Sequence, residues 1–134
     1  MANLTQSINN TLYFLIRVIY SLHMKEKTHS SLSGDQLLAI LAALDNPHRL
    51  RIIALLATNG RNYVSQLARE IGISRPLLHL HLQKLEAAGL VSSRLELSDD
   101  GKALNYFEVN SFAFELSPPV IAEAAKSLKT NPET

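Results

Sequence analysis

Residues 74–84 include side chains of types that bind nucleic acids, and these side chains lie on one side of a predicted helix. With successive residues 100° apart, its side chains separate into two opposite faces. The face that must be buried holds Leu78, His81, Leu82 and Leu85. The outward face holds Pro76, His79, Leu80 and Gln83, flanked by Arg75 and Lys84. These residue types favour contact with DNA through a helix laid in the major groove.

Different contacts are predicted for the individual side chains. Arg75 is the first choice for reading a base, because it lies in the first turn and a guanidinium can bind two acceptors of one guanine. His79 and Gln83 suit bases or phosphates, and Leu80 suits a thymine methyl group. Phosphate contacts, which position a protein without specifying sequence, are predicted for Lys84, Arg69 and Arg61, for Ser65 and Ser74 at helix N-termini, and for Arg94 and Lys102 on a hairpin.

Capping signals divide the region around these residues into two short helices. The first is expected to begin at Ser65 and to close at Gly72, since glycine suits the left-handed C-terminal position. The second is expected to begin after Ser74 and to stop at Gly89. Two short helices joined by a tight turn that contains glycine form a helix-turn-helix.

The remaining elements are predicted from apolar periodicity and from strand formers. Helices are expected over 4–27, 34–44, 47–58 and 120–128. A short strand is expected at 62–64, and a hairpin is expected from 90–97 and 103–109 around the turn 98–102. The fold predicted is mainly α: a winged helix-turn-helix with a three-helix core and a β-hairpin wing, plus extra helices at both termini.

Three regions follow from this order of elements. Residues 1–34 are expected to be an N-terminal dimerisation helix, 35–110 the DNA-binding domain, and 111–134 a C-terminal dimerisation helix with a frayed tail. The two terminal helices are apolar and lie outside the motif, so they are predicted to pair in a symmetric homodimer. The residues expected at that interface are Leu12, Leu15, Ile16, Ile19, Leu22, Ile121 and Leu128.

Composition and charge limit the function classes. The net charge of the 134 residues is only +1, so any surface that binds nucleic acid must be local. Such a surface lies within 61–84, where four basic residues outnumber one acidic residue, Glu70. The sequence has no cysteine, which excludes thiolate metal sites among these residues. We predict no enzyme, cofactor or metal site, since no glycine-rich phosphate loop, activated nucleophile or metal-ligand spacing is present.

The first helix does not predict a membrane span. Its apolar centre from Leu12 to Leu22 is interrupted by Arg17, and it is shorter than the roughly 18 residues that a span needs. No cationic leader precedes the apolar stretch, so cytoplasmic localisation is expected.

Several sequence blocks, in order and spacing, resemble the ArsR family of regulators. They are Asn46 to Leu56, Val64 to Ala68, Ile71 to Pro76, His81 to Leu85 and Ala88 to Val91. The resemblance covers about half the chain. It implies a homodimeric repressor that binds a palindromic DNA operator and leaves it when a metal ion or another signal binds. A small-molecule effector is compatible with this pattern and is not identified by it.

The sequence departs from the family pattern in three places. Metal-responsive members have Cys or His ligands in the helix before the turn or in the terminal helices, where this chain has Val64, Ser65 and a last helix without His or Cys. The predicted recognition helix has Leu77 and Leu80 at positions that are usually polar, and the wing tip is Asp99-Asp100. Outward leucines and an acidic tip favour protein contact, so the alternative is a winged-helix protein–protein interaction module without DNA binding.

The buried histidine of the recognition helix and the basic residues before it receive structural interpretations. His81 is expected to be a hydrogen-bonded structural residue, because it lies on the apolar stripe. His48, together with Arg49 and Arg51, is interpreted as solvated or interfacial.

Overall fold

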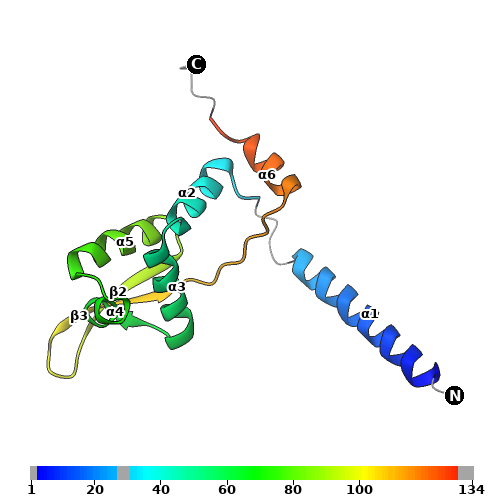
Figure 1. Ribbon diagram of the computed structural model, residues 1–134, viewed down its shortest axis with the longest axis horizontal. Coiled ribbons are helices and arrows are strands. Elements are labelled where there is room, and N and C mark those ends of the chain that lie inside the picture. Colours follow the sequence, from blue (N-terminus) through cyan, green and yellow to red (C-terminus); the bar gives the residue numbers. More distant parts are fainter. Residues whose placement is uncertain (1–2, 27–30, 130–134) are drawn as a thin grey trace. The chain divides into compact units, whose positions relative to one another are not determined.

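The computed structural model of the chain describes residues 3–26 and 31–129 (Figure 1). They fall into two units, the first within 1–31 and the second within 32–134. Each unit is considered by itself. The predicted end of the first helix, Lys27, lies outside the described residues.

The first unit is a single helix, α1, from Asn3 to Glu26. Its apolar residues form a seam with spacings of four, four, three, four and three, which is the pattern of a helix that pairs with another helix. The seam consists of Leu4, Ile8, Leu12, Leu15, Ile19 and Leu22, whose side chains are 49% to 78% exposed. None of the described helices is long and apolar enough to cross a membrane.

Two capped helices open the second unit. Helix α2, Gly34–Leu44, begins at the predicted capping box, in which the Ser33 hydroxyl accepts from the Gln36 backbone and the Gln36 side chain accepts from the Ser33 backbone. Helix α3, Pro47–Asn59, begins after Asn46, whose side chain accepts from the first free N–H groups. Both predicted starts are therefore confirmed.

The helix-turn-helix consists of α4, Val64–Ile71, and α5, Arg75–Ala87. Gly72 ends α4 in the left-handed region, with φ of 78° and ψ of 35°, as the sequence predicts. The predicted cap at Ser65 is wrong. The N-cap is Tyr63, which has no side-chain cap hydrogen bond, because Tyr63 still belongs to a strand and the helix begins at the next residue.

The sheet has three antiparallel strands in the order β1-β3-β2: β1, Asn62–Tyr63, β2, Val91–Leu97, and β3, Ala103–Val109. The hairpin of β2 and β3 is the predicted wing. The short strand β1 joins it by pairing with Tyr106 and Phe107, so the wing is anchored to the start of α4. Only the folded chain brings these distant segments together.

The core of the second unit lies where α2, α3, α4 and α5 meet the base of the sheet. Its fully buried side chains are Ile52, Leu56, Leu67, Leu78, Leu82, Leu85, Leu90 and Val91. Three of them come from α5, so the predicted recognition helix is fixed by its own apolar stripe.

The C-terminal helix α6, Pro118–Ala125, is shorter than the predicted 120–128 helix and packs on α2 (Figure 1). Its last turn tightens to hydrogen bonds between residues three apart, which ends the helix before Leu128. The contact needs a glycine at the start of α2, because a Cβ on Gly34 would lie 2.7 Å from the Ala124 carbonyl oxygen. The Gly34 N–H donates to the Ser127 hydroxyl at 2.7 Å.

Candidate nucleic-acid interface

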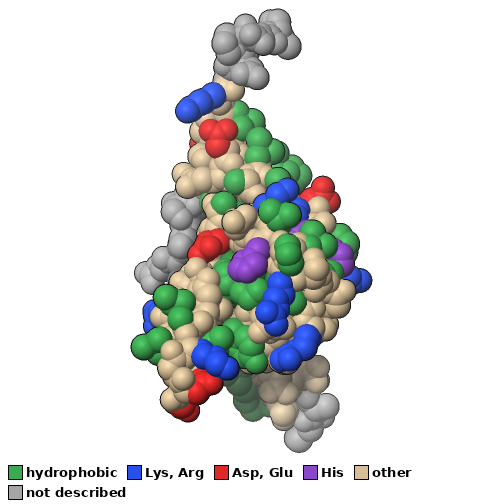
Figure 2. Space-filling model, turned by 90° about the vertical axis from the view of Figure 1, so that its left-hand side faces the viewer, with side chains coloured by type: hydrophobic (Ala, Val, Ile, Leu, Met, Phe, Trp, Pro, Cys, Tyr) green, Lys and Arg blue, Asp and Glu red, His purple; other side chains and the backbone are tan. Residues whose placement is uncertain are grey.

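The two faces of α5 lie as the sequence predicts. Leu78, Leu82 and Leu85 are at most 1% exposed, and His81 is 8% exposed. The residues of the outward face, from Arg75 to Lys84, are exposed. Figure 2 views the side of the molecule on which α4, α5 and the wing lie, and shows Lys and Arg side chains gathered there with histidine and hydrophobic side chains among them.

The N-terminus of α5 is held by Ser74. The Ser74 hydroxyl accepts from the Leu77 N–H at 3.4 Å, and the Ser74 carbonyl accepts from Leu78 at 2.9 Å. Arg75 and Pro76 follow in the first turn, where proline needs no hydrogen-bond partner. Arg75 is exposed and has no ion-pair partner in the described part of the chain. Its guanidinium is therefore available to acceptors outside the subunit.

The helical candidates for phosphate contact have different surroundings. Lys84 is exposed in the last turn of α5 and Arg69 in the last turn of α4, where the Arg69 guanidinium donates to the Gln66 side chain. Ser65 lies in the first turn of α4 and is half-buried. Arg69 and Lys84 thus present positive charge to solvent.

Arg61 and Arg94 both lie beside Tyr106 of the sheet. Tyr106 of β3 pairs with Tyr63 of β1 on one side and with Arg94 of β2 on the other. The Arg61 guanidinium lies 4.9 Å from the centre of the Tyr106 ring and forms an ion pair with Glu96. Part of the charge of Arg61 is therefore compensated within the subunit, whereas Arg94 is exposed beside it. The spacing of these residues in the sequence did not predict this cluster.

At the tip of the wing, Lys102 is partly compensated by a neighbouring carboxylate. Lys102 Nζ lies 3.5 Å from the Asp100 carboxylate, and both side chains are exposed. The hydrogen bond donated by the Ser98 hydroxyl is the main cause that keeps the pKa of the Asp100 carboxyl below its ordinary value. The tip stays acidic near neutral pH, so Lys102 is a weaker phosphate candidate than Arg94.

The predicted dimerisation residues lie on α1, on α6 and just beyond the end of α6. Leu12, Leu15, Ile16, Ile19 and Leu22 are 49% to 63% exposed on α1, and Ile121 is 47% exposed on α6. Leu128 lies beyond the end of α6, where its side chain meets Gly34 of the same subunit.

Arg49 corrects the interpretation of the basic cluster at the start of α3. It is 6% exposed rather than solvated, and its guanidinium donates to the Ala42 and Ala43 carbonyl oxygens at the end of α2. Sequence reasoning missed it because an arginine after an N-cap is normally exposed. Its polar partners are backbone atoms of another helix, which no side-chain pattern reveals.

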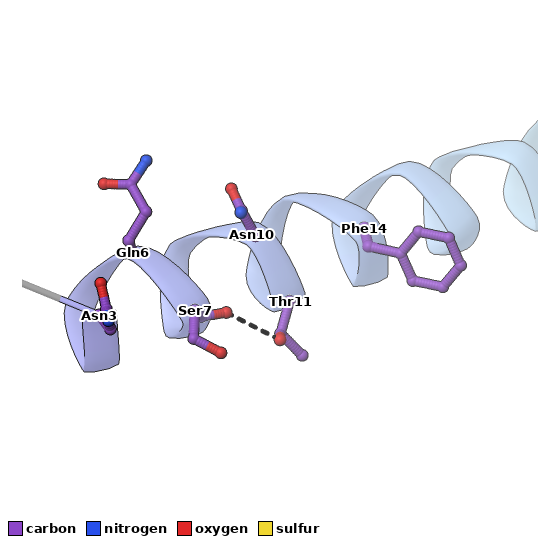
Figure 3. Close-up of a pocket in the computed structure, with 6 residues that line it drawn as sticks. All are labelled: Asn3, Gln6, Ser7, Asn10, Thr11 and Phe14. Carbon is purple, nitrogen blue, oxygen red and sulfur yellow. Dashed lines mark hydrogen bonds between the residues drawn. The ribbon is translucent and has the colours of Figure 1, made fainter.

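The described residues form neither an enclosed pocket on α1 nor a cluster of metal ligands. The hollow drawn in Figure 3 lies on the polar side of α1 and is lined by residues of that helix, from Asn3 to Phe14, with one hydrogen bond from the Thr11 hydroxyl to the Ser7 carbonyl at 2.9 Å. A single helix with an open surface offers no enclosure for a ligand. Within 3–26 and 31–129, no three His, Cys, Asp or Glu side chains are grouped as metal ligands.

The fold and the exposed face of α5 define a winged helix-turn-helix regulator, and comparison with known proteins gives the family. Residues 46–93 match the model of the bacterial regulatory proteins of the arsR family. An HTH-type transcriptional regulator from Methanocaldococcus jannaschii is 37% identical over 79 residues, which cover 59% of this chain and 81% of the relative. The chain therefore belongs to the ArsR family, whose members are transcriptional regulators and not an enzyme class.

Solved structures show the same fold. One is the solution structure of a homodimeric winged helix-turn-helix DNA-binding domain from Mycobacterium bovis, described as a possible ArsR-family regulator. It is 28% identical, with a TM-score of 0.50, over 69% of this chain and 74% of that one. HlyU from Vibrio cholerae is 22% identical, also with a TM-score of 0.50, over 74% of this chain and 92% of that one. At this identity the likeness shows the fold alone.

Proposed function

We propose that the protein is a homodimeric repressor that binds a palindromic DNA operator through α5. The observation that carries this proposal is the outward face of α5, which is exposed from Arg75 to Lys84 and contains no acidic residue. A first-turn arginine on an exposed helix suits base contacts in the major groove. Because the protein would act on DNA, we also propose that it is cytoplasmic.

Two copies would give the operator its symmetry. The solved relative from Mycobacterium bovis is described as homodimeric, and the seam on α1 provides an apolar surface for a second copy. In this proposal residues 1–34 and 111–134 dimerise, and 35–110 bind DNA. Two α5 helices related by a twofold axis would contact major-groove segments roughly 34–36 Å apart.

Base reading and phosphate anchoring are assigned to different side chains. Arg75 reads a base, with His79 and Gln83 beside it, and Pro76 packs at the start of the helix. The exposed cations Arg69, Lys84 and Arg94 anchor phosphates, with Ser65 and Ser74 at helix N-termini. Arg61 and Lys102 anchor phosphates less strongly, since each has an ion pair within the subunit.

A binding titration separates the two roles. Duplexes selected from a random pool are titrated at two salt concentrations with the wild type, Arg75→Ala and Lys84→Ala. Arg75→Ala should relax the preference at one base pair of each half-site by roughly 1–3 kcal/mol. Lys84→Ala should weaken all duplexes alike and reduce the salt slope by about one. Binding that is absent or insensitive to salt would overturn the proposal and favour the protein-interaction module.

Leu80 provides an independent test of α5 in the groove. Its side chain is 58% exposed between Arg75 and Lys84, where it can pack on the C5-methyl group of thymine. Replacing every thymine of a selected duplex by uracil removes only those methyl groups. The wild type should bind the uracil duplex more weakly than the thymine duplex. Leu80→Ala should bind the two duplexes with equal affinity. Arg75→Ala should stay as sensitive to uracil as the wild type. Equal affinity of the wild type for both duplexes would contradict the assignment of Leu80.

A further inference from the structure

Arg49 and His81 meet where the end of α2, the start of α3 and the middle of α5 come together. They are the two buried polar or charged side chains of the described residues, at 6% and 8% exposed. His81 lies on the inner side of the same helix that presents Arg75 and His79 outward. A change at this junction therefore acts directly on the position of the recognition helix.

The guanidinium of Arg49 forms hydrogen bonds with the end of α2. Its Nε donates to the Ala43 carbonyl oxygen, and Nη2 donates to the Ala42 carbonyl at 3.1 Å and approaches the Asp45 carbonyl at 3.5 Å. The last carbonyls of a helix have no partner within it and carry the negative end of its dipole. A permanent cation with a planar fork of donors satisfies several of them at once.

The same guanidinium extends to α5. Arg49 Nη1 lies 3.4 Å from His81 Nδ1, which is a long contact. Because a guanidinium has only donors, the contact is attractive only when Nδ1 of His81 keeps its lone pair. The junction therefore selects a neutral imidazole whose proton is on Nε2. A second proton would place N–H groups of two cations against each other.

The titratable and charged groups around His81 all disfavour a second proton on its ring. Burial is the first cause that lowers its pKa below 6.5, followed by Arg49 and His48 of α3 and by Lys84 of its own helix. The His48 ring centre is 5.5 Å from that of His81. Helix α2 contributes carbonyl oxygens, which Arg49 occupies, while α4 and β2 bury the apolar Leu67, Ala68 and Val91.

The junction also lacks compensation for added charge. No carboxylate forms an ion pair with Arg49 or His81 within the described part of the chain. His81 Nε2 and His48 Nδ1 are buried there without a hydrogen-bond partner. A proton added to His81 would meet neither a counter-charge nor an acceptor, and such a buried charge is costly.

We propose that Arg49, acting through His81, is the positioning residue of the recognition helix, and that protonation of His81 releases α5 from the α2–α3 corner and weakens DNA binding. The effect on DNA rests on the proposed function, whereas the effect on the free protein does not. A histidine whose pKa is lowered by folding binds its proton better in the unfolded chain. Its contribution to stability is therefore complete above pH 6.5 and is lost as the pH falls through the pKa of the folded state.

The test uses the full chain and two substitutions of His81. His81→Asn keeps an oxygen acceptor near the position of Nδ1 and does not titrate, whereas His81→Leu removes the acceptor. The melting temperature is measured without DNA from pH 8 to 5.5, and affinity for a selected duplex is measured at pH 7.5 and 5.5. The parent and all its variants carry His79→Gln, so that the outward face of α5 contains no histidine.

His81→Asn should bind like the parent at pH 7.5, and His81→Leu should bind more weakly. Between pH 7.5 and 5.5 the melting temperature of the parent should fall by a few degrees more than that of His81→Asn. Over the same range the parent should lose roughly fivefold or more of its affinity for the duplex. His48→Gln should keep this sensitivity to acid. Arg49→Lys, which keeps the charge without the planar fork, should melt lower and bind more weakly.

Two outcomes would overturn the proposal. One is the same pH profile of melting temperature for the parent and His81→Asn. The other is an unchanged affinity and melting temperature for His81→Leu at pH 7.5. If the wild type selects no duplex, the proposed function fails and the effect on DNA fails with it, while the melting profiles still decide whether His81 controls the junction.

Discussion

Helices α5 and α1 both carry a continuous apolar stripe, but the two stripes have different surroundings. Leu78, Leu82 and Leu85 on the inner side of α5 are at most 1% exposed, whereas the side chains of the α1 seam are about half exposed or more. Burying one leucine stabilises a fold by roughly 1.5–3 kcal/mol. Helix α5 obtains this stabilisation within its own unit, whereas α1, the one helix described in its unit, does not bury its seam there. The position of α5 can thus be settled within its own unit, while α1, which we propose to dimerise, needs a second surface.

The largest effect should come from breaking the inner side of α5. Leu78→Ala removes a fully buried side chain, and the resulting cavity should lower the free energy of unfolding by roughly 2–5 kcal/mol. Leu80→Ala, two residues away and 58% exposed, should change it by less than about 0.5 kcal/mol. Urea titrations of both variants measure the difference. Equal losses would mean that α5 does not have an inner and an outer side.

The next effect should come from the seam of α1. Ile19→Glu places a charge in the proposed dimer contact, so the protein should become monomeric by solution mass at micromolar concentration. DNA affinity should then fall roughly a hundredfold, as expected when two linked binding modules are separated. Asn10→Glu, on the polar side of the same helix, serves as the matched control and should remain dimeric. A dimeric Ile19→Glu protein would assign dimerisation to other residues.

The smallest effect should come from the two predicted N-cap serines. Ser74→Ala removes the acceptor of the Leu77 N–H and should destabilise the fold by about 1 kcal/mol. Ser65→Ala removes no cap hydrogen bond and should change stability by less than about 0.5 kcal/mol. Thermal melts at neutral pH compare the two serines, and a larger loss for Ser65→Ala would restore it as a cap.

Local signals in the sequence predicted the helices around the motif well. Asn46 and Ser74 act within one turn of the backbone they cap, and Gly72 fits a left-handed position that other residues avoid. The inner and outer sides of α5 follow from a period of 3.6 residues, which needs no knowledge of the partner helices.

The errors arose where distant segments meet. Tyr63 rather than Ser65 precedes α4, because β1 pairs with β3 more than 40 residues later. Leu128, which stays a prediction for the dimer contact, also meets Gly34 within the subunit, and the sequence did not predict that contact. Strand pairing and close helix contact depend on residues far away in the chain, so no short window of sequence contains them.

The sequence by itself determined the family, the helix-turn-helix and the residues that α5 presents outward, because caps, turns and periodicity act over a few residues. The tertiary structure decided the surroundings of the charged groups: Arg49 under α5, Arg61 on Tyr106, and Lys102 beside Asp100. The effect of a charge depends on burial and on its nearest partners, and both are fixed only when separate elements pack together.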